Sequence, residues 1–268
     1  LFSTSVGVDA LFKSLLFLPV NENRALFVEP VLSLGWTLDF EMYFYTIFAF
    51  SLMFSAKRLW LVGMWIGLTV LLVPYYLGVF TVNPLVSHVY AVSYMNIITN
   101  PIVLEFFAGC CIAQVYISDR VRISNPTVAY CLISVSIALM LWWNYAETGV
   151  LHGINRWGGS LAFMVLIFAI ASKTVHIPVP RILVYVGEIS FSLYLMHLSA
   201  RVILDWVVVK LGAAAMMNSW SYVLLTTVVA VCVGGLSYKY LEQGFSEWVR
   251  AKLTALLPTS GKDGRLVH

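Results

Sequence analysis

The chain has 268 residues, of which 60% are hydrophobic and 11% are charged, and its formal net charge is +3. Because soluble domains carry roughly 25% charged residues, this composition and a mean hydropathy of +0.87 exclude an ordinary water-soluble protein and indicate that lipid is the solvent. The 16 Lys and Arg residues form no basic run, so no nucleic-acid partner is expected.

Seven continuous apolar segments are the candidates for helices that cross a membrane, which need about 20 residues each. Their approximate bounds are 38–56, 59–80, 94–117, 127–145, 157–172, 187–208 and 219–238. The runs are continuous rather than alternating, which favours helices over a closed barrel. The predicted fold is therefore an all-α, polytopic transmembrane bundle. Residues 1–20 look like the lower part of a further span whose beginning is missing, so we expect the chain to be a fragment.

The basic residues predict how this bundle is oriented. One side holds the loops after the first, third and fifth spans and the C-terminus; it carries eleven Lys and Arg residues, against three on the opposite side (Arg24, Arg156 and Lys210). The positive-inside rule makes the richer side cytoplasmic. We therefore expect a multi-pass protein of the cell membrane, in particular the bacterial inner membrane. Residues 1–245 would form the membrane domain, and 246–268 a cytoplasmic interfacial helix and tail.

Two carboxylates stand at the head of the first span, in the stretch "GWTLDFEMYFY". Asp39 and Glu41 are two residues apart, so on a helix they point about 200° from each other and cannot act as an acid–base pair. Asp39 is predicted to be stabilised by the N–H groups at the helix N-terminus. Glu41 lies deeper and shares a face with Phe44, Tyr45 and Phe48, whose rings can lie flat against a sugar or an acyl chain.

A third carboxylate, Glu105, lies near the middle of its span in "NPIVLEFFAGCCIA". Ionisable groups in a bilayer are expensive and often functional. Two interpretations stay open for it. Glu105 either lines a functional site inside the bundle or is a hydrogen-bonded helix-packing residue.

The sixth span carries a polar face. Its members recur at steps of four, three, four and four, which keeps them on one side of a helix: Ser190, Tyr194, His197, Arg201 and Asp205. Arg201 and Asp205 can pair, and His197 can exchange a proton near neutral pH. A lone His in an apolar helix usually satisfies a packing hydrogen bond, but a whole polar face favours the lining of a cavity.

These motifs together resemble the membrane acyltransferase 3 family. The first stretch fills the family pattern W-[ST]-L-x-x-E-x-x-F-Y and is most similar to its exopolysaccharide O-acetyltransferase branch; the matching positions are Trp36, Thr37, Leu38, Glu41, Phe44 and Tyr45. "NPIVLEFFAG" resembles a second family segment, with Glu105 as its acid. "VGEISFSLYLMH" resembles a third, with His197 as its His. "YKYLEQGF" resembles the closing segment, although Gln243 and Gly244 replace a basic residue and Pro.

The resemblance implies a bundle of about ten helices and transfer of an acyl group, usually acetyl, from acyl-CoA to a sugar hydroxyl. The acceptor would be an exported or cell-surface polysaccharide or its lipid-linked precursor. The family's catalytic His and an Arg lie further upstream, and no position in this sequence matches them, so this fragment by itself would lack the catalytic base. No bound cofactor or metal is implied; acyl-CoA, the carbohydrate acceptor and the bilayer are the expected partners.

The same resemblance assigns roles to named residues. Glu41 would act in catalysis by orienting the upstream His. Arg201 would hold a CoA phosphate or the Asp205 carboxylate. The residues expected to contact substrate are Trp36, Tyr45, Glu105, Tyr194, His197 and Arg201.

Two other classes of protein remain alternatives. A transporter or flippase for a lipid-linked sugar would also use intramembrane Glu, His and Arg, although such proteins often show internal repeats. A non-catalytic sensor or assembly subunit would keep the fold without the reaction. Consumption of labelled acyl-CoA separates the enzyme from both.

Overall fold

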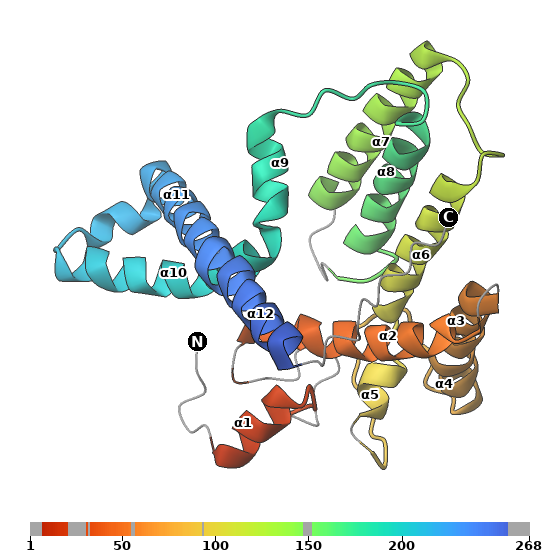
Figure 1. Cartoon of the computed structure of the whole chain (residues 1–268), viewed down its shortest axis with the longest axis horizontal. Helices are drawn as coiled ribbons and strands as arrows, with labels where there is room; N and C mark the ends of the chain where they lie inside the picture. The colour runs from red at the N-terminus through yellow and green to blue at the C-terminus, as the bar shows by residue number, and fades with distance from the viewer. Residues whose placement is uncertain are drawn as a thin grey trace, which may run out of the picture. The chain divides into compact units, whose positions relative to one another are not determined.

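A computed structural model describes residues 7–20, 31, 33–54, 57–92, 94–146 and 152–256. Every regular element in these residues is a helix, which confirms the all-α prediction (Figure 1). The chain forms two compact units, here called the N-terminal unit (residues 2–178) and the C-terminal unit (residues 179–268).

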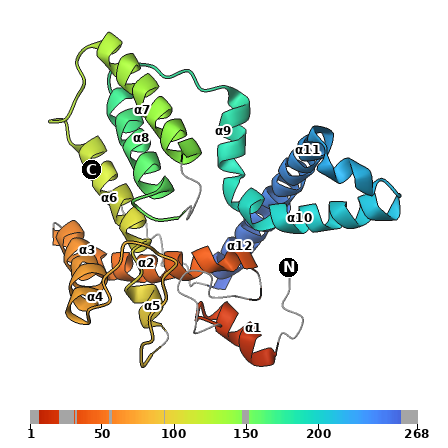
Figure 2. The same cartoon turned by 180° about the vertical axis from the view of Figure 1, so that it is seen from behind.

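Within the described residues, the N-terminal unit contains ten helical segments. They are α1 (Val8–Leu15), η1 (Ser33–Gly35), α2 (Trp36–Leu52), α3 (Arg58–Ile66), η3 (Gly67–Leu72), α4 (Val73–Tyr76), α5 (Met95–Ile98), α6 (Val103–Ile117), α7 (Pro126–Ala146) and α8 (Trp157–Ala171). Helix α2 packs against α3, α5 and α6, while α8 packs against α6 and α7. Figures 1 and 2 both show α7 and α8 side by side.

Five helices in the described residues are long and apolar enough to cross a membrane: 58–76, 95–117, 126–146, 190–210 and 220–254. The predicted first and fifth spans form the shorter helices α2, with 17 residues, and α8, with 15. The predicted partial span does not continue as a helix to residue 20. Within residues 7–20 the only helix is α1, which ends at Leu15, before a turn in which Phe17 has a φ of 56°.

Proline shapes two of the spans. In the second, a π-helical segment, η3, precedes Pro74, whose ring removes a backbone donor and crowds the preceding turn. In the third, the helix is interrupted at Asn100 and Pro101. There the Asn100 side chain accepts from the Ile102 N–H at 3.0 Å and donates to the Pro84 carbonyl at 3.0 Å. This break starts α6 at Val103, so Glu105 lies in the first turn of α6 although it is central in the span.

The core of the N-terminal unit forms around one face of α2. That face contributes Trp36, Phe40, Tyr43 and Phe44, and the facing helices contribute Val62, Ile66, Val70, Ile97, Ile102 and Val103. The ring of Phe44 stacks on Phe106 of α6 with centroids 5.1 Å apart. Burial of such rings provides much of the packing between helices, and it fixes the direction in which every other α2 side chain points.

A lysine joins the ends of α6 and α8. The Lys173 ammonium, just beyond α8, donates to the carbonyls of Val115 (3.0 Å), Ser118 (2.7 Å) and Val121 (3.1 Å). The last carbonyls of a helix have no partner within the helix, and a cation near them is favoured by the helix dipole. Lys173 therefore caps α6 from a neighbouring segment.

The C-terminal unit is built on two long helices that lie side by side (Figures 1 and 2). Its elements are α9 (Arg181–Glu188), α10 (Ser190–Lys210), η4 (Ala214–Asn218), α11 (Trp220–Ser237), η5 (Tyr238–Phe245) and α12 (Ser246–Leu256). Gly234 allows the close approach of α10 and α11, because a Cβ there would lie 2.9 Å from the Leu193 Cα. Helices α11, η5 and α12 form one uninterrupted stretch. The segment predicted as an interfacial helix, from residue 246, is helical as α12, but its place at the membrane interface stays a prediction, and the tail from residue 257 lies outside the described residues.

Candidate functional site

Asp39 is buried although it belongs to the first turn of α2. It lies on the same face as Trp36 and Tyr43, and only 1% of it is exposed. Among the described residues, its Oδ2 atom has no hydrogen-bond partner. Its place near the N-terminus of α2 agrees with the prediction, and stabilisation by the N–H groups stays a prediction, but the burial of the carboxyl group was not predicted. The reason for the burial is that the aromatic residues around it form the core, and the carboxyl group is carried inward with them.

Glu41 and Tyr45 lie away from that core face. Glu41 is partly buried, and no hydrogen bond or ion pair joins it to another described residue. Tyr45 is 53% exposed. Tyr43, by contrast, lies in the core. Its hydroxyl accepts a hydrogen bond from Trp65 Nε1 at 2.9 Å, and its ring meets Tyr94 edge-on at 6.4 Å. The catalytic role of Glu41 and the substrate contact of Tyr45 stay predictions.

Glu105 is held by the loop that leads into α8. Its Oε1 atom accepts a hydrogen bond from the Gly153 N–H at 3.1 Å. Gly158, in the first turn of α8, leaves room for the carboxylate, since a Cβ there would lie 2.5 Å from Glu105 Cδ and closer still to Oε1. Gly153 has a φ of 111°, which L side chains rarely adopt. Gly158 is thus required by the position of Glu105, and Gly153 by its own backbone conformation.

The same loop presents a histidine that the sequence did not single out. The His152 ring meets Trp36 edge-on at 5.5 Å and Trp157 at 6.3 Å. These contacts bring the start of α2, the loop before α8 and the start of α8 together. The signal in the sequence was weak: a His beside Gly-rich residues in "HGINRWGGS".

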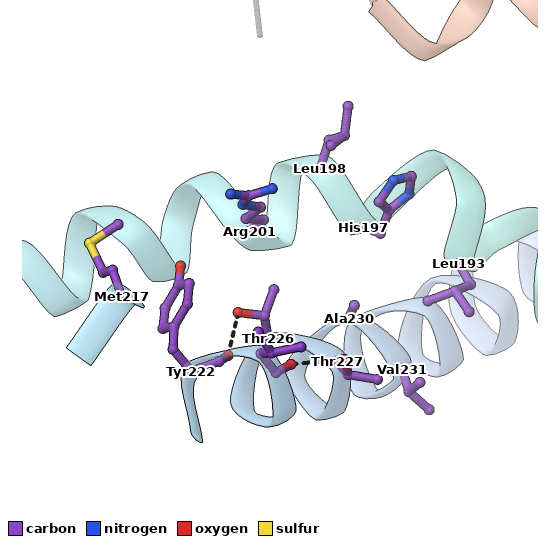
Figure 3. Close-up of a pocket in the computed structure, with 11 residues that line it drawn as sticks. Leu193, His197, Leu198, Arg201, Met217, Tyr222, Thr226, Thr227, Ala230 and Val231 are labelled. Atoms are coloured by element: carbon purple, nitrogen blue, oxygen red, sulfur yellow. Dashed lines mark hydrogen bonds between the residues drawn. The ribbon is translucent and has the colours of Figure 1, made fainter. Parts of the chain in front are cut away.

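The C-terminal unit contains a groove of about 560 Å³ between α10 and α11. It is lined by Leu193, His197, Leu198, Arg201, Met217, Tyr222, Val223, Thr226, Thr227, Ala230 and Val231. Figure 3 shows His197 and Arg201 on α10, and the Tyr222 ring pointing from α11 toward α10. The Thr226 and Thr227 hydroxyls donate to carbonyls of their own helix, both at 2.8 Å, so His197 and Arg201 are the main polar groups available to a ligand.

His197 is held in one orientation by its own helix. Its Nδ1 atom lies 2.7 Å from the Tyr194 carbonyl oxygen, which can only accept. Nδ1 therefore carries a proton, and in the neutral imidazole Nε2 is left as a hydrogen-bond acceptor. Tyr194 itself contributes a ring contact with His197, with centroids 6.0 Å apart, but does not line the groove.

The predicted pair between Arg201 and Asp205 is present, with 4.0 Å between Arg201 Nε and Asp205 Oδ2. The Tyr222 hydroxyl donates to the same carboxylate. Of the two roles left open for Arg201, the structure contains the contact with Asp205. Because 60% of the Arg201 side chain is exposed, this pair is weak and leaves the guanidinium accessible from the groove.

A further carboxylate joins α10 to the π-helical segment η5. The Ser192 hydroxyl donates to Glu242 Oε2 at 2.7 Å. The sequence placed Glu242 only in a weakly matching closing motif. π-helical segments often mark functional positions, and here the irregularity turns a carboxylate toward α10.

The predicted site residues therefore lie in two places. Trp36, Glu41, Tyr45 and Glu105 belong to the N-terminal unit, whereas Tyr194, His197 and Arg201 belong to the C-terminal unit. Within the described ranges, no group of three or more His, Cys, Asp or Glu side chains is arranged to hold a metal ion.

The described residues form long apolar helices. The N-terminal unit buries Asp39 and Trp36, and the C-terminal unit contains a groove lined by His197 and Arg201. These features indicate a membrane protein with polar sites inside its helical units. The chain belongs to the acyltransferase domain family Acyl_transf_3, whose sequence profile matches residues 1–239. This confirms the family that the motifs resemble. The chain is similar to the exopolysaccharide production protein ExoZ of Rhizobium meliloti (strain 1021), with 29% identity over 265 residues, which is 96% of this chain and 74% of the relative. No solved structure matches it.

Proposed function

We propose that this protein transfers a short acyl group, acetyl in the first instance, from acyl-CoA to a hydroxyl of an exported polysaccharide or of its lipid-linked precursor. The observation that carries this proposal is the family match over residues 1–239, together with similarity to a protein named for exopolysaccharide production. The protein would work in the bacterial inner membrane, with its C-terminus in the cytoplasm.

The proposed reaction transfers an acyl group from a thioester to a hydroxyl. The hydroxyl oxygen attacks the thioester carbonyl, the C–S bond breaks, and the hydroxyl proton leaves through a base while the CoA thiolate takes up a proton. Such chemistry requires a base for the hydroxyl proton and hydrogen-bond donors for the tetrahedral oxyanion. The base is expected upstream, and Glu41 would orient it.

The groove between α10 and α11 is suited to the donor. It combines a long apolar wall with Arg201, an accessible cation that a CoA phosphate can approach, and with the acceptor atom Nε2 of His197. Pockets that are mainly apolar with a few oriented polar groups are typical of small-molecule sites. In the N-terminal unit, Trp36 would line the acceptor site, and Glu105 would hold the loop beside it through the Gly153 N–H.

The test is transfer of radioactivity from [1-¹⁴C]acetyl-CoA to polysaccharide in membranes that contain the complete gene product. We expect Glu41→Gln to abolish transfer while the amount of protein in the membrane is unchanged. The matched control is Glu247→Gln, which changes an exposed carboxylate in α12. Full activity of Glu41→Gln would refute the role of Glu41. No transfer by the wild type, combined with movement of a lipid-linked sugar across the membrane, would favour a flippase instead.

A further inference from the structure

The loop before α8 gathers one imidazole, two indoles and one carboxylate in the N-terminal unit. We propose that this loop and the first turn of α8 (residues 152–158) bind the sugar acceptor: His152 accepts a hydrogen bond from a sugar hydroxyl, and the Trp157 indole packs against the sugar ring. In this arrangement Glu105 is a positioning residue, which holds the loop and does not contact the sugar. The assignment of a sugar as the ligand rests on the proposed function.

The loop is held in place by features that a simple connection does not need. Glu105 Oε1 accepts from the Gly153 N–H at 3.1 Å, which fixes the backbone immediately after His152. The Gly153 backbone, with a φ of 111°, passes close to Pro84, because a Cβ at Gly153 would lie 3.0 Å from the Pro84 Cδ. Gly158 then lets α8 begin directly against the carboxylate. The glycine turn and the carboxylate together determine where the imidazole lies.

The His152 ring is also oriented from both sides. Trp36 meets it edge-on at 5.5 Å and Trp157 at 6.3 Å. Trp36 is 8% exposed and forms the fixed wall, whereas Trp157 is 37% exposed and offers part of its indole surface. A buried ring, a partly exposed indole and a polar group between them offer a sugar ring an apolar surface and one hydrogen-bonding group.

The hydrogen-bonding groups of the His152 ring suit a sugar hydroxyl. Partial burial lowers the pKa of His152 from its ordinary value, so the ring is neutral at neutral pH. A neutral imidazole has one nitrogen that accepts a hydrogen bond, and a sugar hydroxyl has a proton to donate. The ligand that suits an accepting nitrogen beside an apolar indole surface is therefore a neutral ring that carries hydroxyl groups.

The experiment measures KM separately for the two substrates, using the complete gene product in detergent micelles. The probes are [1-¹⁴C]acetyl-CoA and oligosaccharides from the producing strain's exopolysaccharide after alkaline O-deacetylation. We expect His152→Ala to raise KM for the oligosaccharide roughly tenfold, the effect of losing one well-placed hydrogen bond. KM for acetyl-CoA should not change. The control is His176→Ala, an exposed His beyond the other end of α8, which should leave both constants unchanged.

The positioning role of Glu105 has its own pair of variants. A Gln side chain keeps an oxygen that accepts from the Gly153 N–H, so Glu105→Gln should retain the wild-type KM for the oligosaccharide. Glu105→Ala loses this acceptor and should raise that KM to the level of His152→Ala. If Glu105→Gln raised KM as much as Glu105→Ala, the carboxylate charge would matter, and the positioning role would be wrong.

Binding of the oligosaccharides without acetyl-CoA separates this inference from the proposed function. If the wild type transfers no acetyl group but binds the oligosaccharides, and His152→Ala weakens that binding about tenfold, the acceptor site stands while the acyltransferase proposal fails. If His152→Ala changes neither the binding nor KM for the oligosaccharide, the acceptor site is refuted, whatever the activity. A folding defect would show as a reduced melting temperature, and Trp157→Leu then provides the second test of the same KM.

Discussion

The contact between Glu105 and Gly158 predicts that a single methyl group added at Gly158 destabilises the protein. Gly158→Ala places a Cβ 2.8 Å from Glu105 Cγ and 2.5 Å from Cδ, so the carboxylate must move. Moving it breaks its hydrogen bond with the Gly153 N–H, worth about 1–3 kcal/mol, and crowding adds about 1–3 kcal/mol. We expect the free energy of unfolding to fall by about 2–6 kcal/mol.

The assay is denaturant-induced unfolding in detergent micelles, followed by tryptophan fluorescence. Gly109→Ala is the matched control, because Gly109 lies in α6, the helix that carries Glu105, and has open space around its Cα. There Ala should be neutral or stabilise by up to about 1 kcal/mol.

A double variant isolates the contact. In a Glu105→Ala background the space next to Gly158 is empty, so Gly158→Ala should then cost less than about 1 kcal/mol. An equal cost in both backgrounds, or a Gly158→Ala protein as stable as the wild type, would refute this reasoning.

Three further predictions concern other contacts. Gly234→Ala should destabilise by about 1–3 kcal/mol in the same unfolding assay, because its Cβ would meet the Leu193 backbone, which cannot rotate away. Ser192→Ala removes the hydrogen bond to Glu242 and should cost about 1–2 kcal/mol, with faster amide exchange in η5 as the measurement; unchanged exchange would contradict it. Burial lowers the pKa of His152, so the folded state takes up its proton at lower pH than the unfolded chain, and stability is lost as pH falls below about 6.5. The melting temperature should drop more between pH 7.5 and 5.5 for the wild type than for His152→Gln, and equal drops would count against it.

Local contacts were the part of the site that the sequence could predict. Arg201 and Asp205 are four residues apart on α10, and they pair. His197 follows Tyr194 by three residues, and their contact also stays within one helix. Both follow from helical periodicity, which holds regardless of what surrounds the helix.

The burial of Asp39 could not be predicted in the same way. Helix α2 is apolar on nearly every side, so it has no polar stripe to show which face meets the core. Only the facing helices decide that Trp36, Phe40 and Tyr43 turn inward, and Asp39 with them. Glu41, which the family pattern emphasises, is consequently on another face.

The contacts of Glu105 could not be predicted from the sequence for a different reason. Glu105 and Gly153 are 48 residues apart, and nothing near either residue specifies the other. The two adjacent glycines in "RWGGS" show that something approaches the backbone, but they do not say what. The break at Asn100 and Pro101, which was visible as an interruption of the span, is what moves Glu105 to the first turn of α6.

Lys173 has a consequence for how the protein is assembled in the membrane. Its three hydrogen bonds require the end of α8 to emerge on the same face of the bilayer as the end of α6. A chain inserted with α8 reversed would leave the ammonium and those carbonyls separated by the hydrocarbon layer, each without its partner. Lys173 therefore favours the arrangement in which α6 and α8 end on the same side of the bilayer, and a chain with a topological error could not form its three hydrogen bonds.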